Sequence, residues 1–421
     1  MSPSAQTIDE FRSDARAWLD ANARRLDSDA ESFEWGAGDL PVEFFPERTD
    51  DEERAHMAAI AAWEQKKAEV GYHAPTWSTE LGGLGVSNQY ALAYAELEAE
   101  YETPGRHELF SVTTGMVAPT VQSDGTDEQR ERFVQRFLRC EEWCCQLFSE
   151  PGAGSDLASL ACKAVADGDE WVITGQKVWT SGAPFAQWGF LIARTDPTVP
   201  KHRGLTAFLV PMETEGVEVV PIRQMTGGSS FSEVFFTDAR VPDSLRIGEV
   251  GKGWGVALTM LGHERGNSSR RGARKRPGGS SVEALATAKA FDATDDPVMR
   301  QKLAQADSRE RIRLLTAQRA TAQQRAGGTP GPEGSIGKLF WVDGLNAITD
   351  VVGGVLGPRL LADTDEWGTY DWNEHVTGSP GYRVAGGSDE IQRNIIGERV
   401  LGLPREPGPG KDTPFSELPK N

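Results

Sequence analysis

The chain is poor in the features of secreted, membrane-embedded or zinc-binding proteins. It has four cysteines, two of them adjacent (Cys144 and Cys145), and their spacing completes no zinc site. We therefore expect free thiols, a reducing cytoplasmic location and no bound metal. No apolar run reaches the roughly 20 residues of a membrane span. The N-terminus has the mixed charges of an amphipathic helix and lacks the apolar core of a signal peptide.

Positive charge is also scarce. The formal net charge of −19 and the isoelectric point near 4.9 exclude nucleic acid as the main partner, because binding to a phosphate backbone needs a broad basic face. Arg and Lys nevertheless make up six of the twelve residues 265–276. Charge alone favours a solvated surface for this run, and the alternative is a site for a phosphate-bearing small molecule.

Hydrophobic periodicity divides the sequence into three folded regions and a tail. Residues 1–144 show the three- and four-residue spacing of helices. Residues 145–249 contain short β-rich runs separated by Gly, Pro and Asp. The helical period returns over 250–405, and residues 406–421 form a Pro-rich tail that we expect to be extended. This order predicts an α+β protein with helical, β and helical domains.

Two stretches in and near the β region carry candidate ligand contacts. FSEPGAGSD (148–156) combines small residues with hydroxyls, so its backbone can approach a phosphate or a flat ring closely, although an ordinary glycine-rich turn explains the pattern equally well. In KVWTSG, Trp179 precedes the hydroxyls of Thr180 and Ser181, which suits a planar heterocycle; a core tryptophan is the commoner alternative. GKGWG (251–255) follows no βαβ pattern, which excludes a Rossmann site.

Together these stretches resemble the acyl-CoA dehydrogenase family, over about residues 7–405. The resemblance rests on FSEPGAGSDLASL, WVITGQKVWTSGA, GLTAFLVPM, QMTGGSSFSEVFFTDARVP, GKGWGVALTML and GGSDEIQRNIIGERVLGLPRE, in that order. It is strongest for the actinobacterial branch that handles branched, alicyclic or sterol-derived acyl-CoAs. It implies a helical N-domain, a β-barrel-like middle domain and a C-terminal four-helix bundle. It also implies bound FAD, α,β-desaturation of an acyl-CoA, a homo- or hetero-tetramer, and an electron-transfer flavoprotein as acceptor.

The position of the catalytic base is the main difference from the best-known family members. Their catalytic Glu stands in a Tyr-Glu-Gly-Thr context, where this sequence has Ala385 and Gly386. Another branch carries the base in a Glu-Arg pair at the start of the first long helix of the C-terminal domain, and Glu264 with Arg265 matches that placement. The resemblance therefore implies Glu264 as the catalytic base and Arg265 as a substrate contact; the structural alternative for Glu264 is a plain ion pair with an Arg.

The remaining roles are carried over by motif. The expected flavin contacts are Leu147, Phe148, Ser149, Trp179, Thr180 and Ser181. Ser155 meets substrate or pyrophosphate, and Gly387 lies over the thioester. The expected contacts to FAD of the same or a neighbouring subunit are Gly353, Gly354, Ser388 and Glu390. Two further departures are a helix-breaking Pro277-Gly278-Gly279 and the lack of an interface Arg near Phe291, for which Lys289 and the basic run 265–276 are the candidate substitutes.

These observations leave three functional hypotheses. The leading one is an FAD-dependent acyl-CoA dehydrogenase for branched or bulky chains, because Gly386 frees room where other members carry the base. A flavin oxidase on the same fold is a second reading. A catalytically silent subunit of a mixed tetramer is a third, favoured by Gly386 and the missing Arg and opposed by Glu264 and the complete FSEPGAGSD motif.

Overall fold

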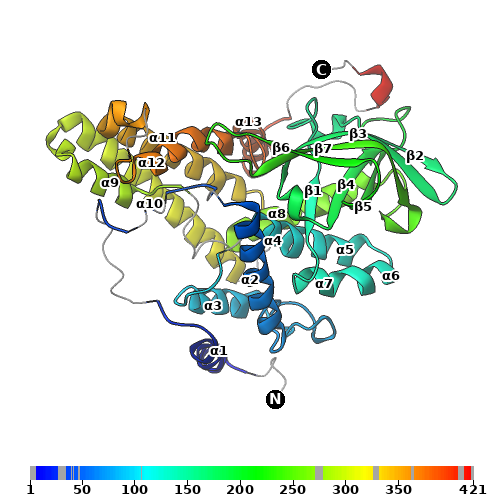
Figure 1. Ribbon diagram of the computed structural model, residues 1–421, viewed down its shortest axis with the longest axis horizontal. Helices are drawn as coiled ribbons and strands as arrows, with labels where there is room; N and C mark the ends of the chain where they lie inside the picture. Colours follow the sequence, from blue (N-terminus) through cyan, green and yellow to red (C-terminus); the bar gives the residue numbers. More distant parts are fainter. Residues whose placement is uncertain are drawn as a thin grey trace.

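The β-sheet lies to one side of the long C-terminal helices, and short helices of the N-terminal region lie beneath it (Figure 1). The computed structural model describes residues 6–26, 35–38, 40, 42–45, 48–105, 107–270, 278–325, 331–361, 365–405 and 412–418, without the side chains of 264–270 and 324–325. The observed order confirms the expected succession of helical, β and helical regions.

The N-terminal region is helical, as its periodicity predicts. Its helices are α1 (Ile8–Asn22), α2 (Asp50–Ala68), α3 (Asn88–Glu98), α4 (Glu108–Val112), α5 (Ala118–Asp124), α6 (Asp127–Gln129) and α7 (Gln135–Leu138). Capping boxes begin α1, α2 and α6. The side chains of Thr7, Thr49 and Thr126 each accept the backbone N–H of the residue three positions later, and the side chain of that later residue accepts the backbone N–H of the threonine. π-helical turns at Thr113–Val117 and Arg130–Val134 join α4 to α5 and α6 to α7.

The described strands of the middle region form one eight-stranded sheet. The strands are β1 (Cys144–Leu147), β2 (Lys163–Asp167), β3 (Glu170–Ser181), β4 (Trp188–Arg194), β5 (Leu205–Pro211), β6 (Val217–Ile222), β7 (Phe231–Pro242) and β8 (Arg246–Ile247). Their order is β6-β7-β3-β2-β4-β5-β8, with β1 paired in parallel to β4. Within the described residues, β6 and β8 end this path, so the sheet is open where a barrel-like domain was expected. One of its faces packs on α5, α7 and α8 through a shared core that includes Val121, Phe137, Phe190, Leu209 and Ala257.

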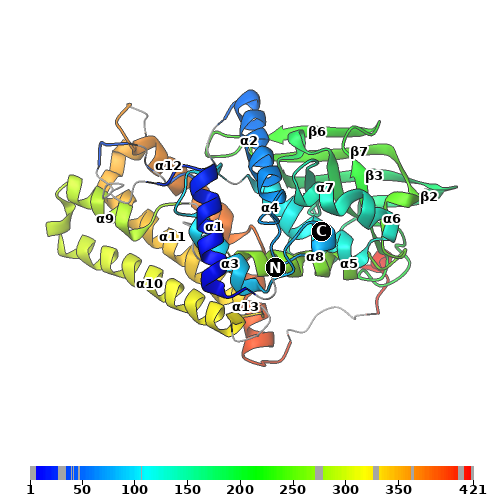
Figure 2. The ribbon, with the colours of Figure 1, turned by 90° about the horizontal axis from the view of Figure 1, so that it is seen from below.

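The C-terminal region consists of longer helices. They are α8 (Gly253–Arg270), α9 (Ser281–Ala290), α10 (Pro297–Arg325), α11 (Gly334–Leu356), α12 (Thr369–Gly378) and α13 (Asp389–Ile395). α10 runs beside α11 (Figure 2). The predicted interruption before α9 is present. Gly278 has φ +88°, and a side chain there would collide with Phe44 and Leu345, so only glycine fits.

Helix α11 corrects the expectation that no segment is long and apolar enough to span a membrane. Residues Gly334–Leu361 meet that test by length and composition. In the fold, the inward face of α11 supplies Val342, Leu345, Ile348, Val351 and Val352 to the buried interior of the bundle. A core helix of a water-soluble bundle passes the same test, and this packing accounts for the composition.

The described part of segment 35–45 belongs to the C-terminal core, which periodicity did not predict. Trp35 contacts Phe291 and Trp367, each with a ring-centroid distance of 5.1 Å. Leu40 and Val42 are buried with the side chains of α11 and α12. The buried carboxylate of Glu374, on α12, accepts the backbone N–H of Phe44 at 2.8 Å and that of Phe45 at 3.4 Å. Glu374 therefore fastens this N-terminal arm to the bundle.

We predict that Glu374 makes stability pH-dependent. Desolvation raises the pKa of its carboxyl from 4.5 to about 7. A folded-state pKa above the unfolded one contributes stability that is fully present below pH 4.5 and lost as the pH rises through 7. Glu374→Gln keeps an acceptor oxygen and removes the titration. Its melting temperature should exceed the wild-type value by about 2 °C at pH 8, and the gap should close at pH 5.

The matched control is Glu366→Gln, just before α12, whose carboxylate pairs with Arg359 at a partly exposed position. This variant should follow the wild type across the same pH range. A Glu374→Gln protein whose advantage does not change with pH would contradict the prediction.

Candidate active site

Loop 148–162 leaves strand β1 and is anchored by a buried ion pair. Lys177 Nζ, on β3 and fully buried, lies 2.7 Å from Glu150 Oε1 and donates to the carbonyl of Phe148 at 3.0 Å. The carboxylate of Glu150 also accepts the N–H groups of Ala161 (2.6 Å) and Cys162 (2.9 Å). One carboxylate thus ties the start of the loop to its end and both to β3. Leu147 and Phe148 are buried, and Ser149 is half-buried with its carbonyl bonded to the N–H of Val178.

The outer part of this loop forms an open cleft. A volume of about 1030 Å³, continuous with solvent, is lined by Pro151, Gly152, Gly154, Ser155 and Asp156. A Cβ atom added at Gly152 or Gly154 would meet nothing within 4 Å. The small residues therefore leave the backbone accessible from the cleft, as the sequence predicts.

The C-terminal region reaches the same cleft. Ser155 Oγ donates to Ser388 Oγ at 3.4 Å, so two motifs that are 233 residues apart in the chain meet here. Gly387 directly precedes Ser388 in a turn with positive φ at both Gly386 and Gly387. Glu390, two residues beyond Ser388, is exposed and lies 3.7 Å from Arg393. The structure therefore brings Ser155, Gly387 and Ser388 together.

A second buried carboxylate holds this turn. Asp389 lies 2.9 Å from Arg383 and 3.3 Å from Lys338 of α11. Lys338 Nζ also donates to the carbonyl of Gly387 at 2.9 Å, while the side-chain amide of Gln392 donates to the carbonyl of Gly386 at 2.8 Å. Desolvation lowers the pKa of Lys338, as its position beneath the turn requires.

At the end of β3, the side chains of the tryptophan–hydroxyl motif lie on different faces of the strand: Trp179 is exposed and Thr180 is buried. Trp179 is 59% exposed and has φ +62°, a left-handed conformation that is strained for a bulky residue. The register of β3 against β7 shifts between Lys177 and Thr180, which permits this conformation. Thr180 is only 1% exposed, and its hydroxyl has no hydrogen-bond partner among the described residues. Ser181 is half-buried and precedes Gly182, where a side chain would collide with Leu109.

Gly353 and Gly354 are not part of this cleft within one chain. Both lie near the C-terminal end of α11, where a Cβ at Gly354 would touch Met299 of α10. Lys338, which contacts the Gly387 turn, is fifteen residues earlier on the same helix, or about 23 Å along its axis. Their proposed contact to FAD therefore requires a neighbouring subunit.

Glu264 and Arg265 lie on α8, and their side chains are outside the described residues. The same holds for the side chain of Arg270 and for residues 271–276 of the basic run. Gly386 is in the described turn and has no ionisable group. Within the described residues, no group of three or more His, Cys, Asp or Glu side chains is placed to hold a metal ion.

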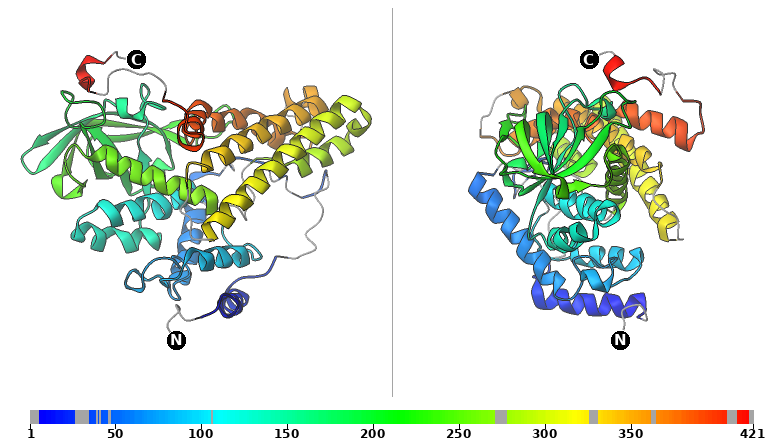
Figure 3. Two further views of the ribbon diagram at one scale, coloured as in Figure 1. Left: turned by 180° about the vertical axis from the view of Figure 1, so that it is seen from behind. Right: turned by 90° about the vertical axis from the view of Figure 1, so that its right-hand side faces the viewer.

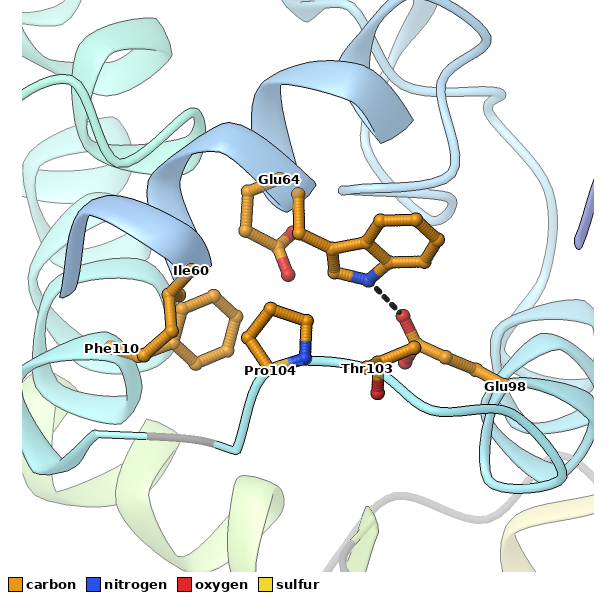
Figure 4. A pocket seen from close by; sticks show the side chains of 7 residues that line it. Ile60, Glu64, Glu98, Thr103, Pro104 and Phe110 are labelled. Atoms are coloured by element: carbon orange, nitrogen blue, oxygen red, sulfur yellow. Dashed lines mark hydrogen bonds between the residues drawn. The ribbon is translucent and has the colours of Figure 1, made fainter. Parts of the chain in front are cut away.

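A narrow pocket lies between α2 and the segment before α4 (Figure 4). Its two carboxylates have partners: Trp63 Nε1 donates to Glu98 at 2.9 Å, and Lys67 pairs with both Glu64 (2.6 Å) and Glu98 (3.0 Å). These contacts join α2 to α3 and make the pocket part of the helical core.

Sequence reasoning did not identify the residues that hold the cleft in place: Glu150, Lys177, Lys338 and Asp389. Lys177 had the clearest signal. It lies in an alternating β pattern, where a lysine is ordinarily expected to face solvent, yet it is buried. Lys338 likewise interrupts an apolar helix. Neither signal names its partner, since the carboxylate that pairs with each lysine lies elsewhere in the sequence.

The fold joins a helical, a sheet and a second helical region, and the cleft lies where the sheet region meets the C-terminal helices. Models of the acyl-CoA dehydrogenase N-terminal, middle and C-terminal domains match residues 42–141, 145–239 and 251–401. Acyl-CoA dehydrogenase IpdE1 of Mycobacterium tuberculosis is 37% identical over 404 residues, covering 95% of this chain and 99% of the relative. The chain therefore belongs to the acyl-CoA dehydrogenase family.

Solved structures agree with this assignment. The Tcur3481-Tcur3483 steroid acyl-CoA dehydrogenase superposes with a TM-score of 0.70 at 25% identity, covering 95% of this chain and 98% of that one. The ChsE4-ChsE5 complex from Mycobacterium tuberculosis has a TM-score of 0.69 at 25% identity, with the same coverage.

We predict that breaking the Glu150–Lys177 pair loosens the cleft loop. Lys177→Met leaves a buried carboxylate without its cation, which costs about 3–5 kcal/mol. The midpoint of urea unfolding should fall accordingly, and proteolysis mapped by mass spectrometry should show earlier cleavage within residues 151–156.

Arg240→Met provides the control in the same sheet, because its pairs with Asp167 and Glu170 are exposed. It should leave the midpoint of urea unfolding close to the wild-type value, because exposed ion pairs contribute little to stability. Equal effects of the two variants would show that the buried pair has no special role.

Proposed function

We propose that the protein is an FAD-dependent acyl-CoA dehydrogenase that introduces a Cα–Cβ double bond into an acyl-CoA thioester. The observation that carries this proposal is the junction of Ser155 and Ser388 at the glycine-lined cleft. Both serines belong to the motifs for which the family resemblance implies cofactor contacts. The same junction joins the sheet region to the C-terminal helices, so a ligand held there contacts both.

The described residues fit FAD in two respects. The accessible backbone at Gly152 and Gly154 suits a pyrophosphate or a flat ring. Trp179 presents a large aromatic surface to solvent in a strained conformation, which is typical of residues held for a function. The hydroxyl of Thr180, an expected flavin contact, is buried on the face opposite to that of Trp179 and gives no such support. When bound, FAD supplies a hydride acceptor at N5.

Glu264 is the proposed base. Its carboxylate takes the α-proton of the thioester, and the electron pair of that C–H bond forms the new π bond as the β-hydrogen leaves with its own electron pair. Two observations support this assignment: Gly386 cannot accept a proton, and Glu264 is on α8, a helix that packs on both the sheet and α11. Ser155 and Ser388 orient the ligand, and Arg265 contacts the CoA moiety.

The substrate is proposed to be a branched or bulky acyl-CoA. Ala385 and Gly386 leave space where other members carry larger side chains, and one structural relative is described as a steroid enzyme. Electrons then pass to an electron-transfer flavoprotein. The placement of Gly353 and Gly354 favours a homo- or hetero-tetramer in which a neighbouring subunit completes the FAD site, and two of the structural relatives are named as pairs of proteins.

The test is anaerobic bleaching of the flavin by a panel of straight, branched and ring-bearing acyl-CoAs. The wild type should be yellow and bleach fastest with a bulky member. Glu264→Gln should retain FAD and bleach about 10²–10⁴-fold more slowly, the usual contribution of a general base. Glu249→Gln, an exposed position just before α8, should behave as the wild type.

Other outcomes decide between the alternatives. Equal bleaching of the wild type and Glu264→Gln would place the base elsewhere. Rapid reoxidation in air would favour the oxidase, and a wild type without FAD would favour the silent subunit. Faster turnover of short straight chains would contradict the bulky-substrate proposal.

A further inference from the structure

The C-terminal tail returns to the sheet region. Residues 412–418 lie along the loop between β4 and β5, where Pro414 forms an isolated bridge with Pro200 (Figure 3). The N–H of Phe415 donates to the carbonyl of Val199, and that of Ser416 to the carbonyl of Pro197, both at 2.9 Å. A Pro-rich tail was expected to be extended, and this part of it instead docks through backbone hydrogen bonds and ends in a short 3₁₀ turn.

The docked tail covers a buried arginine. Arg194, at the end of β4, is 4% exposed, and its guanidinium carbon lies 3.7 Å from the centre of the Phe415 ring. Burial lowers the pKa of Arg194 to about 10, partly offset by the charges of Glu150 and Asp196. The aromatic face stabilises a cation that is withdrawn from water.

Arg194 adds a second anchor to the cleft loop, beside the Glu150–Lys177 pair. Its Nη2 donates to the carbonyl of Ala158 at 2.6 Å and its Nε to the carbonyl of Leu160 at 3.0 Å. Its remaining donor, Nη1, bonds the carbonyl of Lys201 at 3.1 Å. Lys201 in turn pairs with Asp156 of the cleft at 2.7 Å. The tail, the β4–β5 loop and the cleft loop are thereby connected through one guanidinium group.

We propose that residues 412–418 act as a strap, and that Phe415 and Arg194 are positioning residues that set the affinity of the cleft for FAD. The inference rests on the proposed function, because it assumes that FAD occupies the cleft. Phe415 fixes the plane of the guanidinium, and the guanidinium fixes the carbonyls of Ala158 and Leu160. Removal of the ring admits water to Arg194 and loosens the wall of the cleft at Asp156.

The test measures FAD binding to full-length apoprotein together with amide hydrogen exchange over residues 156–160. Phe415→Ala should raise the FAD dissociation constant about three- to tenfold and accelerate exchange in this segment, because the ring no longer stabilises a guanidinium that is withdrawn from water. Phe415→Tyr should restore both values. Glu417→Ala, an exposed residue of the same turn, should match the wild type.

A chain ending at Arg405 removes the whole strap and should show at least the effect of Phe415→Ala. Unchanged FAD affinity and exchange in both would overturn the proposal, and so would weaker binding accompanied by faster exchange throughout the protein, which marks general destabilisation. If the wild type binds FAD but no acyl-CoA bleaches it, the proposed function fails while the strap is still tested. If the wild type binds no FAD, both the proposed function and the proposed effect of the strap on FAD affinity are wrong.

Discussion

The shape of the cleft depends on the buried carboxylate of Glu150, which is held by an ion pair and by hydrogen bonds. Glu150 is buried with Lys177, and the cost of separating two charges in a dry interior keeps the pair closed. Because the same carboxylate also accepts two backbone N–H groups at the far end of the loop, it closes residues 150–162 into a ring. The outer residues of that ring can then be small and exposed without losing their position, which is what a site for close backbone approach to a ligand requires.

The second wall of the cleft is built by the same means from another part of the chain. Asp389 is buried between Arg383 and Lys338, and Lys338 also holds the carbonyl of Gly387. Each wall is therefore a glycine-containing turn whose shape comes from a buried charge network behind it. The two walls meet at Ser155 and Ser388, so sheet and bundle must be correctly assembled before the site exists. This arrangement explains how the turn keeps its structure although Gly386 contributes no side chain.

Local pattern sufficed to predict the helical, β and helical order, most strand positions, the helix break at Gly278 and the small-residue loop. These features depend on periodicity and on glycine or proline within one stretch. Pattern did not show that the arm containing Phe44 belongs to the C-terminal core, that the sheet is open, or that Phe415 covers Arg194. Each of these depends on contacts between distant residues. The apolar composition of α11 was underestimated because Lys338, Asp343 and Asp350 interrupt its runs. The helix places Asp343 and Asp350 apart from its buried face, whereas Lys338 lies on that face and bonds the Gly387 turn.

The most direct test of the account is a crystal structure of the protein with FAD and a non-reactive acyl-CoA analogue. The account predicts that the flavin lies against Trp179 and the loop that contains Ser155, that Ser388 contacts the cofactor, and that the Glu264 carboxylate faces the α-carbon of the thioester. A different carboxylate at the α-carbon, or a flavin bound away from the junction of Ser155 and Ser388, would contradict it.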